Sequence, residues 1–454
     1  MASLNRLLVA NRGEIACRVM RSCRALDIET VAVYSEADAQ AAHVAMADQA
    51  RAIGPSRASE SYLRPEAILQ AAADTGAQAI HPGYGFLSEN AAFAQAVLAA
   101  GLTWVGPRPD SIRDMGDKQR ARELAIAAGV PVVPGSDRYE TGALDGIAES
   151  AARVGYPLLV KAVAGGGGIG MRRVDRPEDL QAVVEASQSM AAKAFGNGAV
   201  FLERYIPLAR HVEIQVFGFG DGNAIHLYER DCSLQRRYQK IIEESPAPGL
   251  PSATRARMAQ AAVDLCRATR YQGAGTVEFI VDAGSFEFYF LEMNTRIQVE
   301  HPVTEMITGR DLVAMQIDLA RDSLPALSQD AIAAQGHAIE CRLYAEDPKR
   351  MFMPSPGRLT VFRPPAGMPG IRVDSGYREG DEITPFYDPM IAKLIAHGED
   401  RDTARRRAAE ALRRFEVEGI RHNRDFLIAC LEHPAFAAGD VHTGFVESHR
   451  QALC

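Results

Sequence analysis

Residues 292–302 read Glu292-Met-Asn-Thr-Arg296-Ile-Gln-Val-Glu300-His-Pro302, with a polar side chain at every second position up to Glu300. Successive side chains of an extended chain point to opposite faces, so one face would carry two carboxylates, two amides and a guanidinium. The other face is apolar enough to lie on a core. An amphipathic strand with a solvated face is one interpretation, but solvated faces usually mix Lys, Thr, Ser and Glu. The row could also serve metal, anion or acid–base chemistry.

A second strand-like run, Gly275–Val281, precedes the segment Phe286–Asn294 and is joined to it by turn-forming residues. Residues opposite one another in an antiparallel pair share a face of the sheet. An odd connection would place Glu278 diagonally beside Glu292, whereas an even connection would place the two carboxylates on opposite faces. Shared binding of a hard cation such as Mg²⁺ or Mn²⁺ requires the odd register. Separate surface carboxylates are the alternative.

A run of glycines lies between two further strand-like segments. Residues 161–171 read Lys-Ala-Val-Ala-Gly-Gly-Gly-Gly-Ile-Gly-Met. Glycines let backbone N–H groups turn toward an anion without a Cβ in the way, and Lys161 can add a point charge. The spacing is not that of a Walker A loop. A flexible hairpin tip is the alternative, but the neighbouring lysine favours a phosphate site.

The N-terminal part has the pattern of a parallel α/β domain. Residues 7–10 and 30–34 predict buried strands, with a helix between them. This βαβ unit, and the alternation that continues to Pro107, predict a parallel sheet.

The rest of the chain mixes short strands and helices. The pattern around the glycine run predicts a small α/β insertion able to move on its own. Strand-rich sequence occupies 200–244 and 273–294, with a hairpin signal at 220–223. The last helix that the pattern predicts clearly is Arg401–Arg414.

Composition narrows the class of protein. The 454 residues exceed what one core normally supports, which predicts about two to four domains. A net charge of −8 without a basic tract argues against nucleic-acid binding, and no apolar run reaches the roughly 18 residues that span a membrane. The seven cysteines are scattered, and the first strand leaves no room for a signal peptide. We therefore expect a reduced, cytoplasmic protein.

Two other stretches are dense in polar groups. Residues 229–240 read Glu-Arg-Asp-Cys-Ser-Leu-Gln-Arg-Arg-Tyr-Gln-Lys, which fits either a site or a solvated strand with ordinary ion pairs. Residues 81–90 read His-Pro-Gly-Tyr-Gly-Phe-Leu-Ser-Glu-Asn, and taken alone their turn residues indicate a structural loop.

Together these motifs resemble biotin carboxylase, an enzyme of the ATP-grasp superfamily. The resemblance begins at Leu8-Val-Ala-Asn-Arg-Gly-Glu-Ile-Ala, includes the stretches above, and continues through His337–Arg342 and Tyr387–Leu394. It implies an ATP-grasp fold of the α/β class, α+β in parts. The implied organisation is an N-terminal Rossmann-like domain (1–115), an ATP-grasp domain (116–330) with a mobile glycine-rich lid at about 132–204, and a C-terminal α+β domain (331–454).

The resemblance implies an ATP-dependent ligase that carboxylates N1 of biotin from bicarbonate through carboxyphosphate. Bicarbonate is a poor nucleophile until it is deprotonated, so a carboxylate must accept its proton while cations hold the anion. The implied catalytic residues are Lys240, Arg296, Glu300 as general base, and Arg342 for the biotin enolate. Gln298, the backbone of Val299, and Tyr84 would complete the bicarbonate and biotin sites.

The resemblance also implies how MgATP is held. Implied nucleotide-binding residues are Lys118, Lys161, Gly167, Gly168, Glu203, Arg204, Tyr205, Ile206, His211, Gln235, Tyr238, Glu278 and Glu292. The implied ligands for Mg²⁺ or Mn²⁺ are Glu278, Glu292 and Asn294.

Two positions depart from the family pattern. Tyr238 stands where the motif usually carries His, and Ile169 replaces a common basic residue of the glycine run. A phenol cannot become cationic, so contacts to phosphate or ribose would differ there. Because all the implied metal, bicarbonate and enolate residues are present, we expect tuning and not loss of catalysis.

No Ala-Met-Lys-Met biotin attachment motif occurs, so we expect no covalent biotin on this chain. The resemblance then implies a separate biotinylated carrier protein, separate carboxyltransferase subunits and a homodimer. The system would be an acetyl-CoA or other acyl-CoA carboxylase, as in fatty acid biosynthesis, or a urea or 2-oxo acid carboxylase. Two further alternatives are another ATP-grasp carboxylate–amine ligase and a nucleotide-binding subunit without turnover.

Overall fold

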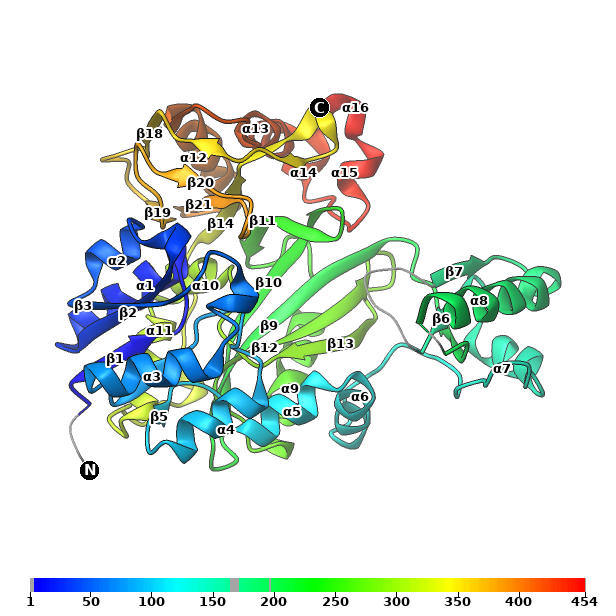
Figure 1. Cartoon of the computed structure of the whole chain (residues 1–454). Helices are drawn as coiled ribbons and strands as arrows, with labels where there is room; N and C mark the ends of the chain where they lie inside the picture. The colour runs from blue at the N-terminus through cyan, green and yellow to red at the C-terminus, as the bar shows by residue number, and fades with distance from the viewer. Residues whose placement is uncertain (1–3, 164–170, 196, 454) are drawn as a thin grey trace.

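The computed structural model describes residues 4–163, 171–195 and 197–453 (Figure 1). Its N-terminal part is a five-stranded parallel sheet of order β3-β2-β1-β4-β5, which confirms the predicted parallel βαβ unit. The strands are β1 (Arg6–Val9), β2 (Glu29–Ser35), β3 (Gln49–Gly54), β4 (Ala79–His81) and β5 (Thr103–Trp104). The helices are α1 (Gly13–Ala25), α2 (Ala42–Met46), α3 (Pro65–Thr75), α4 (Ala91–Ala99) and α5 (Pro109–Gly116).

An antiparallel sheet of order β13-β12-β9-β10-β11-β14-β21-β19 forms the body of the molecule. The strands are β9 (Ala209–Phe219), β10 (Ala224–Arg236), β11 (Gln239–Ser245), β12 (Gln272–Asp282), β13 (Phe288–Asn294), β14 (His337–Tyr344), β19 (Ile371–Ser375) and β21 (Met390–Gly398). The β9–β10 hairpin turns at 220–223, as predicted. Because β11 pairs with β14, one sheet joins the central and C-terminal parts of the chain.

Helices cover this sheet and link its parts. Between β5 and β14 the chain forms α6 (Lys118–Ala127), α9 (Ser252–Ala268), α10 (His301–Thr308) and α11 (Leu312–Ala320). On the C-terminal half, apolar side chains such as Cys341 and Leu394 pack against α12 (Arg401–Arg414) and α13 (Arg424–Glu432). The opposite face of the same strands carries Arg342 and Lys393. One face of β14 and β21 therefore packs in the hydrophobic core, and the other face carries charged side chains.

Helices continue beyond Arg414, where the sequence pattern gave no clear helix. They are α13, α14 (Pro434–Ala438), α15 (Phe445–Ser448) and α16 (Arg450–Leu453). These helices are nine residues or shorter, too short to show a clear period. Two-stranded pieces complete this part: β15 (Glu346–Asp347) with β16 (Met353–Pro354), β17 (Gly357–Arg358) with β20 (Glu382–Ile383), and β18 (Val361–Arg363) with β22 (Glu416–Glu418).

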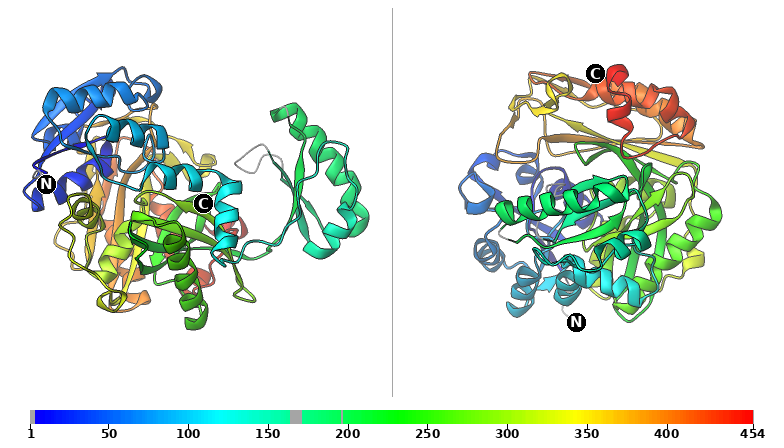
Figure 2. Two further views of the ribbon diagram at one scale, coloured as in Figure 1. Left: turned by 90° about the horizontal axis from the view of Figure 1, so that it is seen from below. Right: turned by 90° about the vertical axis from the view of Figure 1, so that its right-hand side faces the viewer.

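A small three-stranded sheet of order β7-β6-β8 projects away from the rest of the molecule (Figures 1 and 2). It consists of β6 (Leu158–Ala162), β7 (Met171–Val174) and β8 (Val200–Arg204), with α7 (Ile147–Val154) and α8 (Leu180–Phe195). This small unit has its own hydrophobic cluster, which includes Leu158, Val160 and Leu202. This agrees with the α/β insertion that the sequence predicts around the glycine run.

The β12–β13 pairing settles the register that the sequence left open. Next to the turn the strands pair as Val281 with Phe288 and Phe279 with Phe290, which is the register of an even connection. With that register, Glu278 and Glu292 were expected to lie on opposite faces of the sheet. That expectation is wrong, because a bulge follows and Glu278 is the direct partner of Glu292. An extra residue in one strand shifts every later pair by one position.

Arg230, fully buried on β10, ties three strands and one helix together. Its Nε donates to Glu213 Oε1 (2.6 Å), and its other nitrogens donate to Gln215, Thr276 and Thr304 at 2.7–3.1 Å. The stretch 229–236 is thus buried, and the interpretation as a solvated strand is wrong. The six cysteines that the structure describes are also buried. No helix among the described residues is long and apolar enough to cross a membrane.

We predict that Arg230→Met lowers the stability by about 3–5 kcal/mol, because it leaves the buried Glu213 carboxylate without its closest cation. The measurement is the urea midpoint of unfolding. Arg414→Met is the matched control, because Arg414 makes an exposed pair with Glu410 that contributes about 0–1 kcal/mol. Equal midpoints for the two variants would contradict the structural role of Arg230.

Candidate active site

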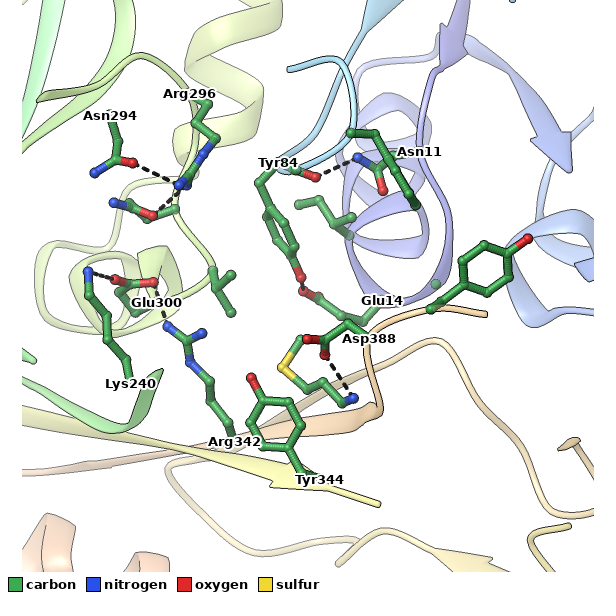
Figure 3. Close-up of a pocket in the computed structure, with 18 of the residues that line it drawn as sticks. Asn11, Glu14, Tyr84, Lys240, Asn294, Arg296, Glu300, Arg342, Tyr344 and Asp388 are labelled. Atoms are coloured by element: carbon green, nitrogen blue, oxygen red, sulfur yellow. Dashed lines mark hydrogen bonds and ion pairs between the residues drawn. The ribbon is translucent and has the colours of Figure 1, made fainter. Parts of the chain in front are cut away.

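A cavity of about 820 Å³ opens where the large sheet, the loop 295–300 and the N-terminal sheet domain meet. Figure 3 shows Lys240, Glu300 and Arg342 on one side and Tyr84, Glu14 and Asn11 on the other. All of the residues that the sequence resemblance implied for bicarbonate, metal and biotin therefore line this one cavity.

Lys240 lies among three buried carboxylates. Its Nζ is 2.7 Å from Glu213 Oε2, 2.8 Å from Glu278 Oε1 and 2.8 Å from Glu300 Oε1. Burial disfavours the lysine cation, but these carboxylates outweigh burial and raise the pKa of Lys240 well above its ordinary value. Lys240 therefore remains a cation at neutral pH.

Glu300 is held between Lys240 and Arg342. Arg342 Nη2 donates to Glu300 Oε2 at 2.9 Å, and Arg342 Nε lies 2.7 Å from Glu243 Oε1. Burial disfavours ionisation of Glu300, but the Lys240 ammonium and the Arg342 guanidinium hold its pKa well below the ordinary range. Glu300 is therefore an ionised carboxylate in contact with two cations, Lys240 and Arg342.

Glu278, Glu292 and Asn294 form an oxygen-rich edge where β12 meets β13. Glu278 Oε1 accepts from Asn294 Nδ2 at 2.9 Å, and Glu278 Oε2 lies 2.8 Å from His211 Nε2. Burial favours the neutral form of Glu278, but the charges of Lys240 and then His211 outweigh burial and lower the pKa of Glu278. Burial and the neighbouring Glu278 carboxylate raise the pKa of Glu292. Carboxylate and amide oxygens in this arrangement fit a hard divalent cation such as Mg²⁺.

The chain leaves the sheet after Asn294, so the alternating row is not one continuous strand. Arg296, in the following loop, donates from Nε to Glu89 Oε2 (2.9 Å), from Nη1 to Gln298 Oε1 (2.5 Å) and from Nη2 to Asn294 Oδ1 (2.8 Å). The guanidinium fork is therefore fixed at the cavity wall. Glu89 was not among the predicted site residues, although it belongs to the polar stretch 81–90.

Tyr84 lines the side of the cavity opposite Arg342 (Figure 3). Its hydroxyl donates to Glu14 Oε1, and Asn11 Nδ2 donates to its carbonyl at 2.7 Å. Burial, with the Glu14 carboxylate, raises the pKa of Tyr84 well above its usual value. Asn11 and Glu14 were not predicted as site residues, and the only signal for them was the motif that begins at Leu8.

Part of the predicted nucleotide set lies at the same cavity. His211 and Gln235 are in contact (Nδ1 to Nε2, 3.0 Å), and Tyr238 is 86% exposed at the β10–β11 turn with φ of +63°. The cavity lining also includes all three of these side chains.

The other predicted nucleotide residues that the structure describes, apart from Glu278 and Glu292, do not line the cavity. Lys161 and Glu203 contact each other on the small sheet, Arg173 lies over the Tyr205 ring (4.4 Å), and Lys118 is exposed at the start of α6. Arg204 belongs to β8, and Ile206 is buried just beyond it. Gly167, Gly168 and Ile169 lie outside the described residues.

Comparison with protein-family models divides the chain into three matches. Residues 3–112 match "Biotin carboxylase, N-terminal domain" and residues 340–448 match "Biotin carboxylase C-terminal domain". Residues 117–326 match "Carbamoyl-phosphate synthase L chain, ATP binding domain".

Curated relatives are similar over the whole chain. Biotin carboxylase 1 of Bacillus subtilis is 51% identical over 449 residues, which are 98% of this chain and 99% of that protein. The mitochondrial methylcrotonoyl-CoA carboxylase subunit alpha of Oryza sativa is 52% identical over 451 residues, which are 99% of this chain. The chain spans only 61% of the length of that rice subunit.

A solved structure gives the same answer for the fold. The biotin carboxylase domain dimer of Hydrogenobacter thermophilus 2-oxoglutarate carboxylase, in complex with MgADP, ADP and bicarbonate, superposes with a TM-score of 0.90 at 45% identity. The match covers 100% of this chain and 99% of that chain. The chain belongs to the biotin carboxylase family of ATP-dependent ligases.

Proposed function

We propose that this chain uses MgATP and bicarbonate to carboxylate N1 of biotin on a carrier protein. The observation that carries the proposal is the position of the ionised Glu300 between Lys240 and Arg342, beside the fixed fork of Arg296. A small anion that must lose a proton needs this combination of one base and several cations. A carboxylate–amine ligase would not require Arg342 in contact with the base.

In the first step Lys240, Arg296, Gln298 and the Val299 N–H hold bicarbonate, and Glu300 accepts its proton. The bicarbonate oxygen then attacks the γ-phosphorus of ATP, the bond to ADP breaks, and carboxyphosphate forms. Lys118, Lys161 and the amides of Gly167 and Gly168 neutralise the phosphate charge, with Glu203–Ile206, His211, Gln235 and Tyr238 around the nucleoside. Positioning and charge neutralisation supply most of the catalysis of phosphoryl transfer.

In the second step the C–O bond of carboxyphosphate breaks to give CO₂ and phosphate, the phosphate accepts the N1 proton of biotin, and N1 of the resulting enolate bonds to the carbon of CO₂. Arg342 stabilises the negative charge of the biotin enolate, because its planar fork suits an oxyanion, and Tyr84 lies beside the ring. The glycine-rich lid, at about 132–204, closes over ATP and excludes water, which protects the hydrolytically fragile carboxyphosphate.

Glu278, Glu292 and Asn294 would hold Mg²⁺, or Mn²⁺ in its place. When bound, the ion neutralises nucleotide phosphate oxygens. The Glu278–Glu292 pairing across β12 and β13, together with the Hydrogenobacter complex with MgADP, supports this assignment.

We further propose that the chain acts with a biotinylated carrier protein and carboxyltransferase subunits of an acyl-CoA carboxylase, in the cytoplasm and as a homodimer. The similarity to a methylcrotonoyl-CoA carboxylase subunit and to the dimeric Hydrogenobacter domain supports these partners. Co-purification of the native complex tests the proposed partners, and sedimentation of the isolated chain tests the homodimer.

The reaction itself is tested by ADP formation with and without bicarbonate and free biotin. We expect bicarbonate-dependent ADP release that biotin stimulates and that EDTA abolishes. Arg296→Ala and Glu300→Ala should abolish turnover and still bind ATP, because both side chains act on bicarbonate. The surface changes Arg414→Ala and Glu410→Ala are matched controls and should keep wild-type rates. Amine-dependent, biotin-independent ADP release would favour the carboxylate–amine ligase, and loss of ATP affinity in R296A or E300A would refute the bicarbonate assignment.

Tyr238→His should leave kcat/KM for MgATP within about tenfold of wild type, because the ring is exposed at the edge of the cavity. We expect the KM for MgATP of this variant to be lower at pH 6.5 than at pH 8, since only an imidazole becomes cationic in that range. Tyr238→Phe is the control without a new charge. A change well beyond tenfold would mean that Tyr238 redefines the nucleotide site.

A further inference from the structure

Lys393 is a fully buried lysine that none of the steps above uses. It lies on β21 directly opposite Arg342 of β14, so two cations face each other across an antiparallel pair. Like charges in that position repel, and a buried ammonium is costly unless it is paired. The carboxylates around them resolve this conflict: Arg342 contacts Glu300, and Lys393 contacts Glu14.

The contacts of Lys393 join three parts of the chain. Its Nζ donates to the carbonyl of Val299 at 2.7 Å and lies 3.1 Å from Glu14 Oε1. Glu14 also accepts the hydroxyl hydrogen of Tyr84. One ammonium therefore connects the loop that carries Glu300 to the side chain on the opposite wall of the cavity.

The loop needs such support because residues 295–300 belong to no helix or strand. Two side chains fix its peptide planes in turn. His301 Nδ1 lies 2.6 Å from the Gln298 carbonyl, which fixes the peptide that bears the Val299 N–H. Lys393 holds the next carbonyl, which fixes the peptide from which Glu300 projects.

We propose that Lys393 is a positioning residue that fixes the peptide between Val299 and Glu300, and that Glu14 extends this support to Tyr84. The inference rests on the proposed function of Glu300 as the base for bicarbonate. Lys393 itself is not expected to contact MgATP, bicarbonate or biotin, because its side chain is fully buried among protein groups. Its loss should impair the use of bicarbonate and leave MgATP binding intact.

A purely structural role makes a different prediction. If Lys393 only neutralised the buried Glu14, then removing both charges together would restore function. If Lys393 acts through the Val299 carbonyl, the double variant Glu14→Gln/Lys393→Met would remain impaired, because no donor replaces the ammonium. This pair of variants separates the two roles.

The kinetic test compares K393M, E14Q and E14Q/K393M with wild type. We expect K393M and the double variant to lower kcat/KM for bicarbonate by at least about tenfold, the size expected for losing a charged hydrogen bond, with the KM for MgATP within about twofold. E14Q should mainly raise the KM for biotin. Recovery of bicarbonate use in the double variant, or unchanged use in K393M, would overturn the proposal. If K393M does not fold, the double variant, in which the charges of Lys393 and Glu14 are removed together, carries the test.

Leu394→Ala is the matched control, because Leu394 is the next residue of β21 and packs in the apolar core on the other face. At a comparable loss of thermal stability it should keep the wild-type KM for bicarbonate. An equal rise in that KM would reduce Lys393 to a structural role.

Hydrogen exchange measures the loop without any turnover. K393M should speed amide exchange in residues 298–301, and L394A should not. This readout separates the two claims: a wild-type protein without bicarbonate-dependent ADP release refutes the proposed function, whereas unchanged exchange in K393M refutes the positioning role.

Discussion

The site depends on the ion pairs between the Lys240 ammonium and three carboxylates. Three buried carboxylates from three segments of the chain, Glu213, Glu278 and Glu300, lie within 2.7–2.8 Å of it. Without that cation the three negative charges would repel one another in a medium that screens them poorly, and burial would force protons onto them. With it, Glu278 and Glu300 have lowered pKa values and remain ionised. Glu278, the proposed metal ligand, and Glu300, the proposed base, can therefore both be ionised in one cavity.

The large sheet brings these groups together. The β11–β14 pairing makes one sheet of two parts of the chain, so that Lys240 from β11 and Arg342 from β14 meet around Glu300. The core against α12 and α13 covers the other face of the C-terminal strands. Lys393, on the neighbouring strand β21, donates a hydrogen bond to the Val299 carbonyl of the loop that carries Glu300. The residues of the proposed anion site and the lysine that holds its loop thus lie on the neighbouring strands β11, β14 and β21.

The sequence predicted the parallel N-terminal sheet, because alternating apolar strands and helices have a clear period. It also predicted about half of the residues that line the cavity, since long motifs such as 229–240 and 292–302 carry many of them. The Glu278–Glu292 pairing could not be predicted, because a single bulge decides it and leaves no periodic signal. Neither could the roles of Glu14, Glu89 and Lys393, because each depends on a contact between segments 70 or more residues apart. The catalytic, substrate-binding, nucleotide and metal roles assigned to the site residues all remain predictions.

In the proposed first step, bicarbonate attacks the γ-phosphorus of ATP in this cavity. Turnover with ¹⁸O-labelled bicarbonate and unlabelled ATP tests it most directly, by mass spectrometry of the released phosphate. If carboxyphosphate forms, the attacking oxygen stays on phosphorus when the carboxyl group leaves, so phosphate should carry one ¹⁸O atom from bicarbonate. Phosphate that contains only oxygen from ATP and water would contradict the account.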